Sequence, residues 1–221
     1  MIKRLLSYFV PIKVYETPSK TSTNLEVTWN NGTLVLDSKH TNYSYGSLEK
    51  VLKKGMRHIG FKTLKDVKST LLLGVAGGSA IKILRNEIHN KGKITGVEID
   101  SKVIDIATTY FNLGNYHNFE IIIEDARIFI TQNEQKFDFI LIDIFEDNAM
   151  PDFLFEDPFI ENIKLAMTKN SYILFNFMLL NDFENKLHKF IAAFDTNEYK
   201  VSTLLNVEAF NNLVIVNKTN E

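Results

Sequence analysis

Hydrophobic and polar positions alternate along the first part of this chain. In the stretch "NLEVTWNNGTLVLD", apolar and polar residues take turns on both sides of Asn31-Gly32, two residues that tolerate the positive φ angles of a tight turn. The pattern predicts a β-hairpin, so we expect residues 1–45 to form a small β unit. Two roles stay open for this unit: a plain cap on the rest of the protein, or a wall of a site or a dimer contact.

The stretch that follows predicts a helix with one basic face. It reads "GSLEKVLKKGMRHIGFKTLKDVKS" over residues 46–69, and its lysines and arginine fall on one side. We interpret this side as a solvated face, since a run of charge is usually one. An anion-binding surface is the alternative.

The pattern changes at Ser69, where short apolar runs begin to alternate with longer helical stretches. We expect strands at 70–73, 94–99, 119–123, 138–143 and 171–178, separated by helical stretches such as 79–90, 101–113 and 157–167. Strands joined by such crossovers predict a parallel sheet that is covered on both faces. Residues 46–221 are thus expected to form an α/β domain.

The end of the chain departs from this alternation. A helix near 182–195 is followed by two strand-like runs, "YKVSTLL" and "NNLVIVN", which are too close together for a crossover helix. They must pair as a hairpin, so one of them lies antiparallel to the rest of the sheet. A seven-stranded, mostly parallel, Rossmann-like sheet with an antiparallel C-terminal hairpin is the layout of the class I S-adenosylmethionine-dependent methyltransferase fold.

Composition and charge argue against several kinds of function. The net charge of −2 gives no electrostatic footprint for nucleic acid, and the chain has no cysteine and five scattered histidines, so we expect no metal site. A chain without cysteine suits a reducing cytoplasm. No stretch approaches the roughly 20 apolar residues that span a bilayer, and "MIKRLLSYFV" lacks a cleavage site, so we expect neither a membrane segment nor a signal peptide.

The glycines after the apolar run 70–73 carry the first candidate chemistry. Gly74, Gly77 and Gly78 form a G-x-x-G-G turn, which is neither the G-x-G-x-x-G of a dinucleotide site nor a phosphate-binding loop. Without Cβ atoms the backbone can approach a ligand closely, and Ser79 is expected to cap the following helix. A tight strand-to-helix turn without a ligand is the alternative.

Acidic residues at the ends of the next two strands fit a nucleoside. Glu98 lies 24 residues after Gly74, near the spacing at which an acceptor-only carboxylate binds both ribose hydroxyls. Asp100 is a weaker candidate for this role and an alternative cap for the next helix. Asp125 can accept from the exocyclic amine of adenine, and the small Ala126 leaves room for the ring. Solvated acids are the alternative at both strand ends.

The segment after the fourth strand is the most unusual. From Asp143 to Glu161 it holds seven carboxylates and no lysine or arginine, with phenylalanines interleaved at 145, 153, 155 and 159. Acids mixed with aromatic rings suit an organic cation, so we expect an aromatic and acidic lid; a solvated acidic loop is the alternative. Asp143, at the carboxyl end of the strand, can serve as a base for an amine nucleophile if burial raises its pKa.

Four stretches together, "LLLGVAGGSAIKIL", "GVEIDSKVIDIATTYF", "IIIEDARIF" and "FDFILIDIFED", resemble spermidine synthase and the wider set of spermidine synthase-like proteins. The resemblance covers roughly residues 25–180. It implies that the Gly74–Ser79 turn cradles the methionine-derived part of the cofactor, while Glu98 holds the ribose. Asp125 and Ala126 would contact adenine.

The same resemblance implies roles on the substrate side. Asp143 matches the acid that deprotonates the attacking amine, and Glu146 matches a second acid of the D-x-x-D pattern. Tyr45 falls near the substrate-site tyrosine of the family. The resemblance also suggests a homodimer.

Two positions differ from the family pattern. Aminopropyltransferases carry an acid within the glycine turn, where this chain has Ala76 or its neighbours. They also carry a Tyr-His-Glu run for the diamine, where Tyr45 is followed by Gly46 and Ser47. We therefore expect a transferase that binds S-adenosylmethionine or its decarboxylated form and moves a methyl or aminopropyl group to a small amine or cationic acceptor, with methyl transfer favoured. A polyamine aminopropyltransferase and a non-catalytic nucleoside-binding module are the alternatives, and the glycine spacing argues against a nicotinamide oxidoreductase.

Overall fold

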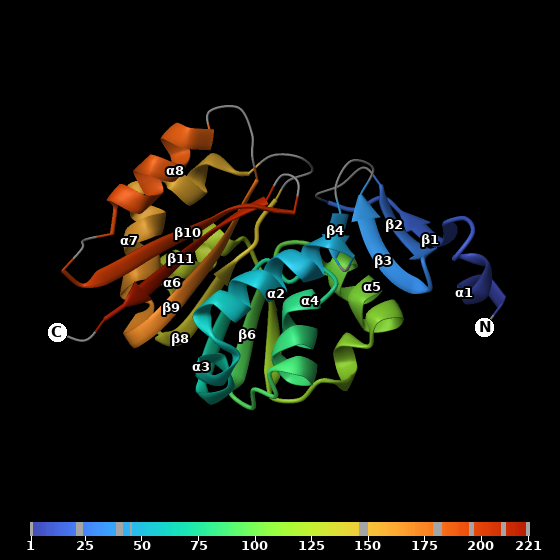
Figure 1. The fold of residues 1–221 in the computed structure, drawn as a ribbon, viewed down its shortest axis with the longest axis horizontal. Helices are drawn as coiled ribbons and strands as arrows, with labels where there is room; N and C mark the ends of the chain where they lie inside the picture. Colours follow the sequence, from blue (N-terminus) through green and yellow to red (C-terminus); the bar gives the residue numbers. More distant parts are fainter. Residues whose placement is uncertain are drawn as a thin grey trace.

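The chain folds around two β-sheets that share one helix between them (Figure 1). The structure, a computed structural model, describes residues 2–20, 24–38, 42–44, 46–145, 150–178, 183–194, 197–208 and 211–219. A four-stranded sheet near the N-terminus and a seven-stranded main sheet both pack on helix α5 (Ser101–Phe111).

The main sheet is built from the apolar runs of the second half of the chain. Its strand order is β10-β11-β9-β8-β5-β6-β7. The strands are β5 (Ser69–Leu73), β6 (Lys93–Glu98), β7 (Phe119–Ile123), β8 (Phe137–Ile142), β9 (Met167–Met178), β10 (Tyr199–Glu208) and β11 (Asn211–Lys218). Neighbours from β7 to β9 pair in parallel, whereas β11 runs antiparallel to both β9 and β10. The predicted α/β fold, with its antiparallel C-terminal hairpin, is confirmed.

Helices cover both faces of this sheet, because its strands are apolar on both sides. One face carries α2, α3, α4 with the π-helical turn η1, and α5, and the other carries α6, α7 and α8 (Figure 1). Their bounds, with those of the remaining helices, are α1 (Ile2–Leu6), α2 (Ser47–Ile59), α3 (Phe61–Asp66), α4 (Ser79–Lys82), η1 (Ile83–Glu87), η2 (Leu113–Asn115), α6 (Ala126–Gln132), η3 (Asp152–Phe155), α7 (Asp157–Leu165) and α8 (Phe183–Ala192). Among the described residues, none of the helices combines the length and the apolar character that crossing a membrane requires.

The N-terminal sheet contains the hairpin that the alternating pattern predicted. Its strands, in spatial order, are β1 (Ile12–Thr17), β2 (Leu25–Asn30), β3 (Thr33–Ser38) and β4 (Asn42–Ser44). Asn31 and Gly32 join β2 to β3 with φ angles of 48° and 75°, which confirms the turn. Leu25 and Val27 are buried in one apolar cluster with Val103 of α5, so this sheet is fixed to the main domain by packing.

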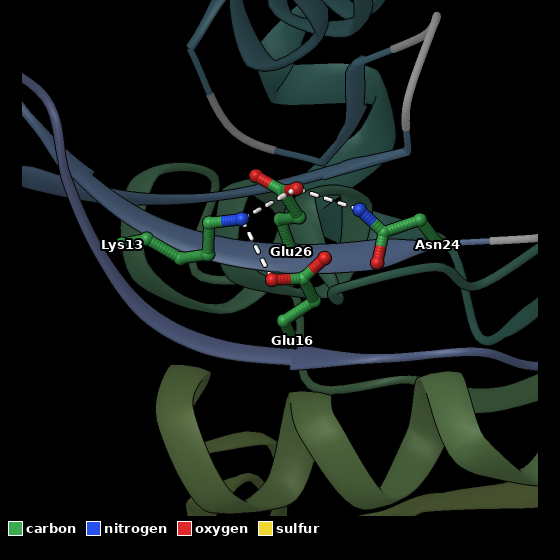
Figure 2. A network of polar contacts seen from close by, with 4 residues as sticks. All are labelled: Lys13, Glu16, Asn24 and Glu26. Carbon is green, nitrogen blue, oxygen red and sulfur yellow. Dashed lines mark hydrogen bonds and ion pairs between the residues drawn. The ribbon is translucent and has the colours of Figure 1, made fainter.

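An exposed polar network lies on β1 and β2 of the same sheet (Figure 2). The Lys13 Nζ donates to Glu16 Oε2 at 2.7 Å and to Glu26 Oε1 at 2.9 Å, and Asn24 Nδ2 donates to the same Glu26 oxygen at 2.6 Å. The hydrogen bonds raise the pKa of Lys13 and lower that of Glu16. Ion pairs this exposed to water contribute little to stability.

The basic stretch 46–69 differs from its prediction in one respect. It forms two helices, α2 and α3, because Gly60 breaks the run with a φ of 110°. Several of its cations have partners: Lys53 pairs with Glu87, and Lys54 Nζ donates to Glu208 Oε1 at 3.0 Å. These contacts neutralise part of the basic face with acidic side chains of the protein itself, so the face needs no bound anion.

Candidate active site

The candidate site lies at the edge of the main sheet where the carboxyl ends of its parallel strands meet. Strand β5 has β6 on one side and β8 on the other, so the strand order reverses at β5, and ligands of open α/β sheets bind at such a point. Gly74 follows β5, Glu98 ends β6, Asp125 comes shortly after β7 and Asp143 follows β8. Four of the predicted site positions therefore share one edge of the sheet.

Gly74 is required by its close approach to the end of β8. Its φ is 90°, and a Cβ atom built on it would lie 2.1 Å from the carbonyl oxygen of Asp143. The Asp143 amide donates to the Leu73 carbonyl at 2.9 Å, so the two strand ends are bonded side by side. The space left by the missing Cβ of Gly74 is thus filled by the backbone of the candidate base.

The rest of the turn leads into helix α4. Gly78, with a φ of 89°, is the N-cap of α4, and Ser79 is already inside the helix, so the prediction that Ser79 caps it is wrong. A Cβ on Gly78 would lie 2.9 Å from Leu113 Cδ1, which explains the glycine there. Gly77 is buried within the turn. Ala76 has a φ of 47°, a left-handed conformation that costs a residue with a Cβ on the order of 1 kcal/mol.

Glu98 holds the glycine turn in place. Its Oε2 accepts hydrogen bonds from the amides of Val75 at 3.2 Å and Ala76 at 3.0 Å, and its Oε1 accepts from the Asp100 amide at 3.2 Å. Burial raises the pKa of Glu98 above its ordinary value, while these hydrogen bonds act in the opposite direction. A carboxylate accepts about four hydrogen bonds, so the half-buried Glu98 keeps capacity for a ligand hydroxyl.

Two other acids cap helices. Asp100 is buried, and its side chain accepts from the Lys102 amide at 3.0 Å at the start of α5, as one alternative predicted. Asp125 does the same at α6, where its Oδ1 accepts from the Arg127 amide at 2.7 Å. Ala126 is the buried first residue of α6. The contact of Asp125 and Ala126 with adenine stays a prediction.

Asp143 is half-buried at the end of β8. Burial raises the pKa of its carboxyl from 3.8 to about 6; a hydrogen bond from Asn176 opposes this rise and the charge of Glu98 adds to it. The Asn176 Nδ2 donates to Asp143 Oδ1 at 2.8 Å, and Asn211 Nδ2 donates in turn to Asn176 Oδ1 at 3.0 Å. Neither asparagine was predicted, although an asparagine inside the apolar run "ILFNFM" is a visible signal for Asn176.

The acidic and aromatic segment differs from the expected lid. Phe155 and Phe159 are buried in the main core, so the expectation that these two rings cover a cation site is wrong. Several of the acids have cationic partners. Asp152, for example, pairs with Lys186 at 2.8 Å. Further ion pairs join Glu161 to Lys164 and Asp157 to Lys189. The described part of the segment therefore serves packing between α7, α8 and η3.

Two predicted site residues, Tyr45 and Glu146, lie outside the described residues. Within the described ranges, no three side chains of the kinds that bind metals come together. The site offers instead half-buried carboxylates along one edge of the main sheet, Glu98, Asp125 and Asp143. Acceptor-only groups fit ribose hydroxyls, an adenine amine and an ammonium group, so the residues present suit an adenosyl sulfonium ligand.

The strand order and the row of acids define a Rossmann-like protein of the class I methyltransferase type. The chain belongs to the family described as the Spermine/spermidine synthase domain, whose sequence profile matches residues 49–196. A polyamine aminopropyltransferase from Vibrio vulnificus is 32% identical over 109 residues, which cover 48% of this chain. The chain spans only 36% of the length of that relative.

Solved structures show the same fold at low sequence identity. A probable spermidine synthase from Corynebacterium glutamicum superposes with a TM-score of 0.73 and 14% identity, covering 95% of this chain and 80% of its own. Human methyltransferase-like protein 13, in complex with SAH, superposes with a TM-score of 0.65 and 18% identity, covering 80% of this chain and 83% of its own. At these identities the likeness establishes the fold alone.

Proposed function

We propose that the protein is a transferase that moves the aminopropyl group of decarboxylated S-adenosylmethionine to a small amine. The observation that carries this proposal is the position of the Asp143 carboxyl, held against the glycine turn at the switch point of the sheet, where burial raises its pKa to about 6. A group with this pKa is ionised at neutral pH and can still take a proton from an amine. Membership of the Spermine/spermidine synthase domain family and the name of the Vibrio relative support aminopropyl transfer better than the methyl transfer that the sequence analysis favoured.

The proposed reaction is a direct displacement. Asp143 first takes one proton from the ammonium group of the acceptor, which frees the lone pair of its nitrogen. This lone pair attacks the carbon next to the sulfonium, a C–N bond forms, and the C–S bond breaks with its electron pair passing to sulfur. The product nitrogen keeps the positive charge that the sulfonium has lost. The protein's part is to align the two reactants at the ends of β5 and β8, to exclude water and to accept that proton.

For the donor half of the site, we carry over the roles that the family resemblance implies, and the geometry at the strand ends supports them. Glu98 would bind the ribose hydroxyls with the acceptor capacity left after its three backbone contacts. The Gly74–Ser79 turn would hold the sulfonium side chain, and Asp125 with Ala126 would contact adenine. On the acceptor side, Tyr45 and Glu146 stay predictions from the family resemblance.

One observation favours methyl transfer as the second candidate. Ala76 stands in the turn where aminopropyltransferases of the family carry an acid for the donor's amine, and it does so in a left-handed conformation. A turn without that acid has no charge to repel the carboxylate of S-adenosylmethionine. Methyl transfer to a small amine would use the same displacement and the same base.

Calorimetric titration with S-adenosylmethionine, its decarboxylated form, methylthioadenosine and NAD separates these possibilities, together with turnover assays using a small diamine. Tighter binding of the decarboxylated donor and an aminopropylated product are expected. Preference for S-adenosylmethionine with a methylated product would establish the second candidate. Binding of the nucleosides without any turnover would indicate a non-catalytic module, and binding of none of the adenosyl ligands would refute the site assignment.

The variant Ala76→Asp tests the donor assignment from inside the turn. Aspartate tolerates the left-handed conformation and places a carboxylate where the donor's ammonium would lie. We expect its preference for the decarboxylated donor over S-adenosylmethionine to rise about tenfold or more, as one good ion pair gives. Ala76→Asn, which keeps the shape without the charge, is the control and should leave the preference unchanged.

A further inference from the structure

Three polar side chains form a row across neighbouring strands of the main sheet, starting from the candidate base. Ile142 of β8 pairs in parallel register with Phe175 of β9, so the next residues, Asp143 and Asn176, stand side by side. Asn211 begins β11, the next strand after β9. The row therefore runs from β8 through β9 to β11.

The hydrogen bonds in this row have a defined direction. An ionised carboxylate only accepts, so the group of Asn176 that lies 2.8 Å from Asp143 Oδ1 must be its Nδ2 donor. Its carbonyl Oδ1 then faces Asn211, which has to donate, and does so from Nδ2 at 3.0 Å. Asp143 thereby fixes the orientation of both carboxamides, that is, which side carries the oxygen and which the nitrogen. An isolated asparagine leaves this orientation open.

Packing alone does not explain Asn176. The residue is 0% exposed and lies between Phe175 and Phe177 in an apolar strand, at a position where an aliphatic side chain would fill the same space. Burying a carboxamide is costly unless its hydrogen bonds are made, and an apolar residue of similar size often serves stability as well or better. The hydrogen bonds of Asn176 with Asp143 and Asn211 therefore offset the cost of burying its amide.

We propose that Asn176 and Asn211 are positioning residues for the base: the two carboxamides in series lock the rotamer of Asp143, occupy its Oδ1 and leave its Oδ2 to receive the proton. This inference deepens the proposed function and rests on it. Within the described ranges, Oδ2 of Asp143 accepts no hydrogen bond from the protein. The hydrogen bond from Asn176 favours the ionised carboxylate and so lowers the pKa of Asp143, whereas burial and the negative charge of Glu98 raise it. Glu98 is the one charged group among the described residues that shifts this pKa.

The test is a pH titration of Asp143 itself, monitored by ¹³C NMR of the full chain with carboxyl-labelled aspartates. The Asp143 signal is assigned as the one that is missing from the spectrum of Asp143→Asn. We expect Asn176→Leu to raise the pKa of Asp143 by about one unit, because it removes a hydrogen bond to a charged group. Asn211→Ala should shift it in the same direction by less. Asn212→Ala is the matched control, since this buried neighbour on β11 instead binds the Asn206 amide through its Oδ1.

An unchanged pKa of Asp143 in folded Asn176→Leu, or an equal shift in Asn212→Ala, would overturn the proposal. Asn211 is half-buried at the start of its strand, so Asn211→Ala carries the test if Asn176→Leu does not fold, and an unchanged pKa there has the same meaning. The titration needs no turnover, so it tests the positioning role separately from the proposed function. If the wild-type protein has no activity but the variants show the expected pKa shifts, the proposed function is refuted and the hydrogen-bonded row of Asp143, Asn176 and Asn211 still stands. In an active enzyme, the acid limb of kcat/KM must move to higher pH with the NMR pKa; a limb that stays in place would refute the positioning role.

Discussion

The carboxyl group of Asp143 combines a structural cost with a proposed chemical use. Its pKa of about 6 is raised by burial and by the nearby charge of Glu98, which means that the folded protein holds the ionised form less favourably than water does. The unfolded chain has no such penalty, so the free energy of unfolding depends on the state of this one group. Stability and reactivity are therefore set by the same desolvation.

Asp143→Asn should abolish turnover and stabilise the fold above pH 6. The neutral amide removes the cost of a buried charge, which for a shift from 3.8 to about 6 is on the order of 1–3 kcal/mol. As the pH falls from 6 toward 3.8, wild type takes up a proton on folding and the advantage of the variant shrinks. Urea denaturation at pH 8 and pH 4 measures this, and an equal difference at both pH values would contradict it.

The pH dependence of wild-type turnover follows from the same group. A base must be ionised, so kcat/KM should fall about tenfold per pH unit below about pH 6 and level off above it. Glu98→Gln removes the negative charge that raises the pKa of Asp143. The fall of kcat/KM on the acid side should therefore occur at lower pH in this variant than in wild type. A limb near pH 4 in wild type would mean that Asp143 is not the base.

At the scale of elements, the junction of β5 with β8 is where the backbone has least room. Gly74→Ala would place a Cβ 2.1 Å from the Asp143 carbonyl oxygen and force a residue with a side chain to a φ of 90°. We expect a loss of stability on the order of 2–4 kcal/mol and weaker nucleoside binding, because the end of β8 must move. Thermal denaturation and titration measure both.

Gly114→Ala is the matched control for this change. A Cβ there would lie 3.5 Å from Thr108 Cγ2, an ordinary contact, so the variant should stay within about 0.5 kcal/mol of wild type. Equal losses at Gly74 and Gly114 would show that the approach to Asp143 is not the reason for the glycine.

The opposite end of the same strands is fixed by Asp138. Its Oδ2 accepts from the Lys68 and Ser69 amides at 2.9 and 3.1 Å, and its Oδ1 from Thr168 Oγ1 at 2.8 Å. Burial acts to raise the pKa of Asp138, but the hydrogen bonds outweigh it and the pKa is lowered. A lowered pKa contributes stability that is present above pH 3.8 and is lost as the pH falls through the folded value.

Asp138→Ala should therefore destabilise the protein by about 1–3 kcal/mol at pH 7 and by less at pH 3, without changing nucleoside affinity. The control is Asp105→Ala, which removes an exposed carboxylate on α5 and should be nearly neutral. Denaturation curves at the two pH values measure the difference. A loss of affinity equal to that of a site variant would contradict the purely structural role.

The sequence predicts most of these elements because strands and turns leave local signals. The apolar runs and the Asn31-Gly32 turn gave the sheet and the hairpin, since their periodicity does not depend on distant contacts. No bounds were predicted for helix α6, because "ARIFITQ" is short and rich in β-branched residues, so its form depends on the Asp125 cap and on packing. The break at Gly60 likewise comes from a φ of 110° that composition alone does not impose.

At the scale of the whole molecule, the strand ends that build the site were predictable and their side-chain partners were not. Glu98 and Asp143 follow apolar runs, so a parallel sheet places them at one edge. The bond from Asn211 to Asn176 depends on the antiparallel register of β11 against β9, which no local pattern determines. The buried Phe155 was mistaken for a lid because its fit against Phe175 is a tertiary contact.

Helix α5 packs against both sheets. On one side, Ala107 belongs to the cluster of the main sheet, and on the other, Val103 and Ile106 belong to the cluster of the N-terminal sheet. Loosening either sheet therefore removes packing from the same helix. We therefore expect α5 to couple the N-terminal unit, which stays a candidate wall of the acceptor site and a candidate dimer contact, to the strand ends of the candidate site.

Leu25→Ala tests this coupling. Leu25 is 0% exposed in the cluster with α5, so its truncation should cost about 2–4 kcal/mol and lower the temperature of a single calorimetric transition for the whole chain. Leu5→Ala, at a leucine that is 60% exposed in α1, should change that temperature little. The opposite result would be two separate transitions in Leu25→Ala, with nucleoside affinity unchanged after the first. It would show that the N-terminal sheet unfolds by itself and that α5 does not transmit this unfolding to the site.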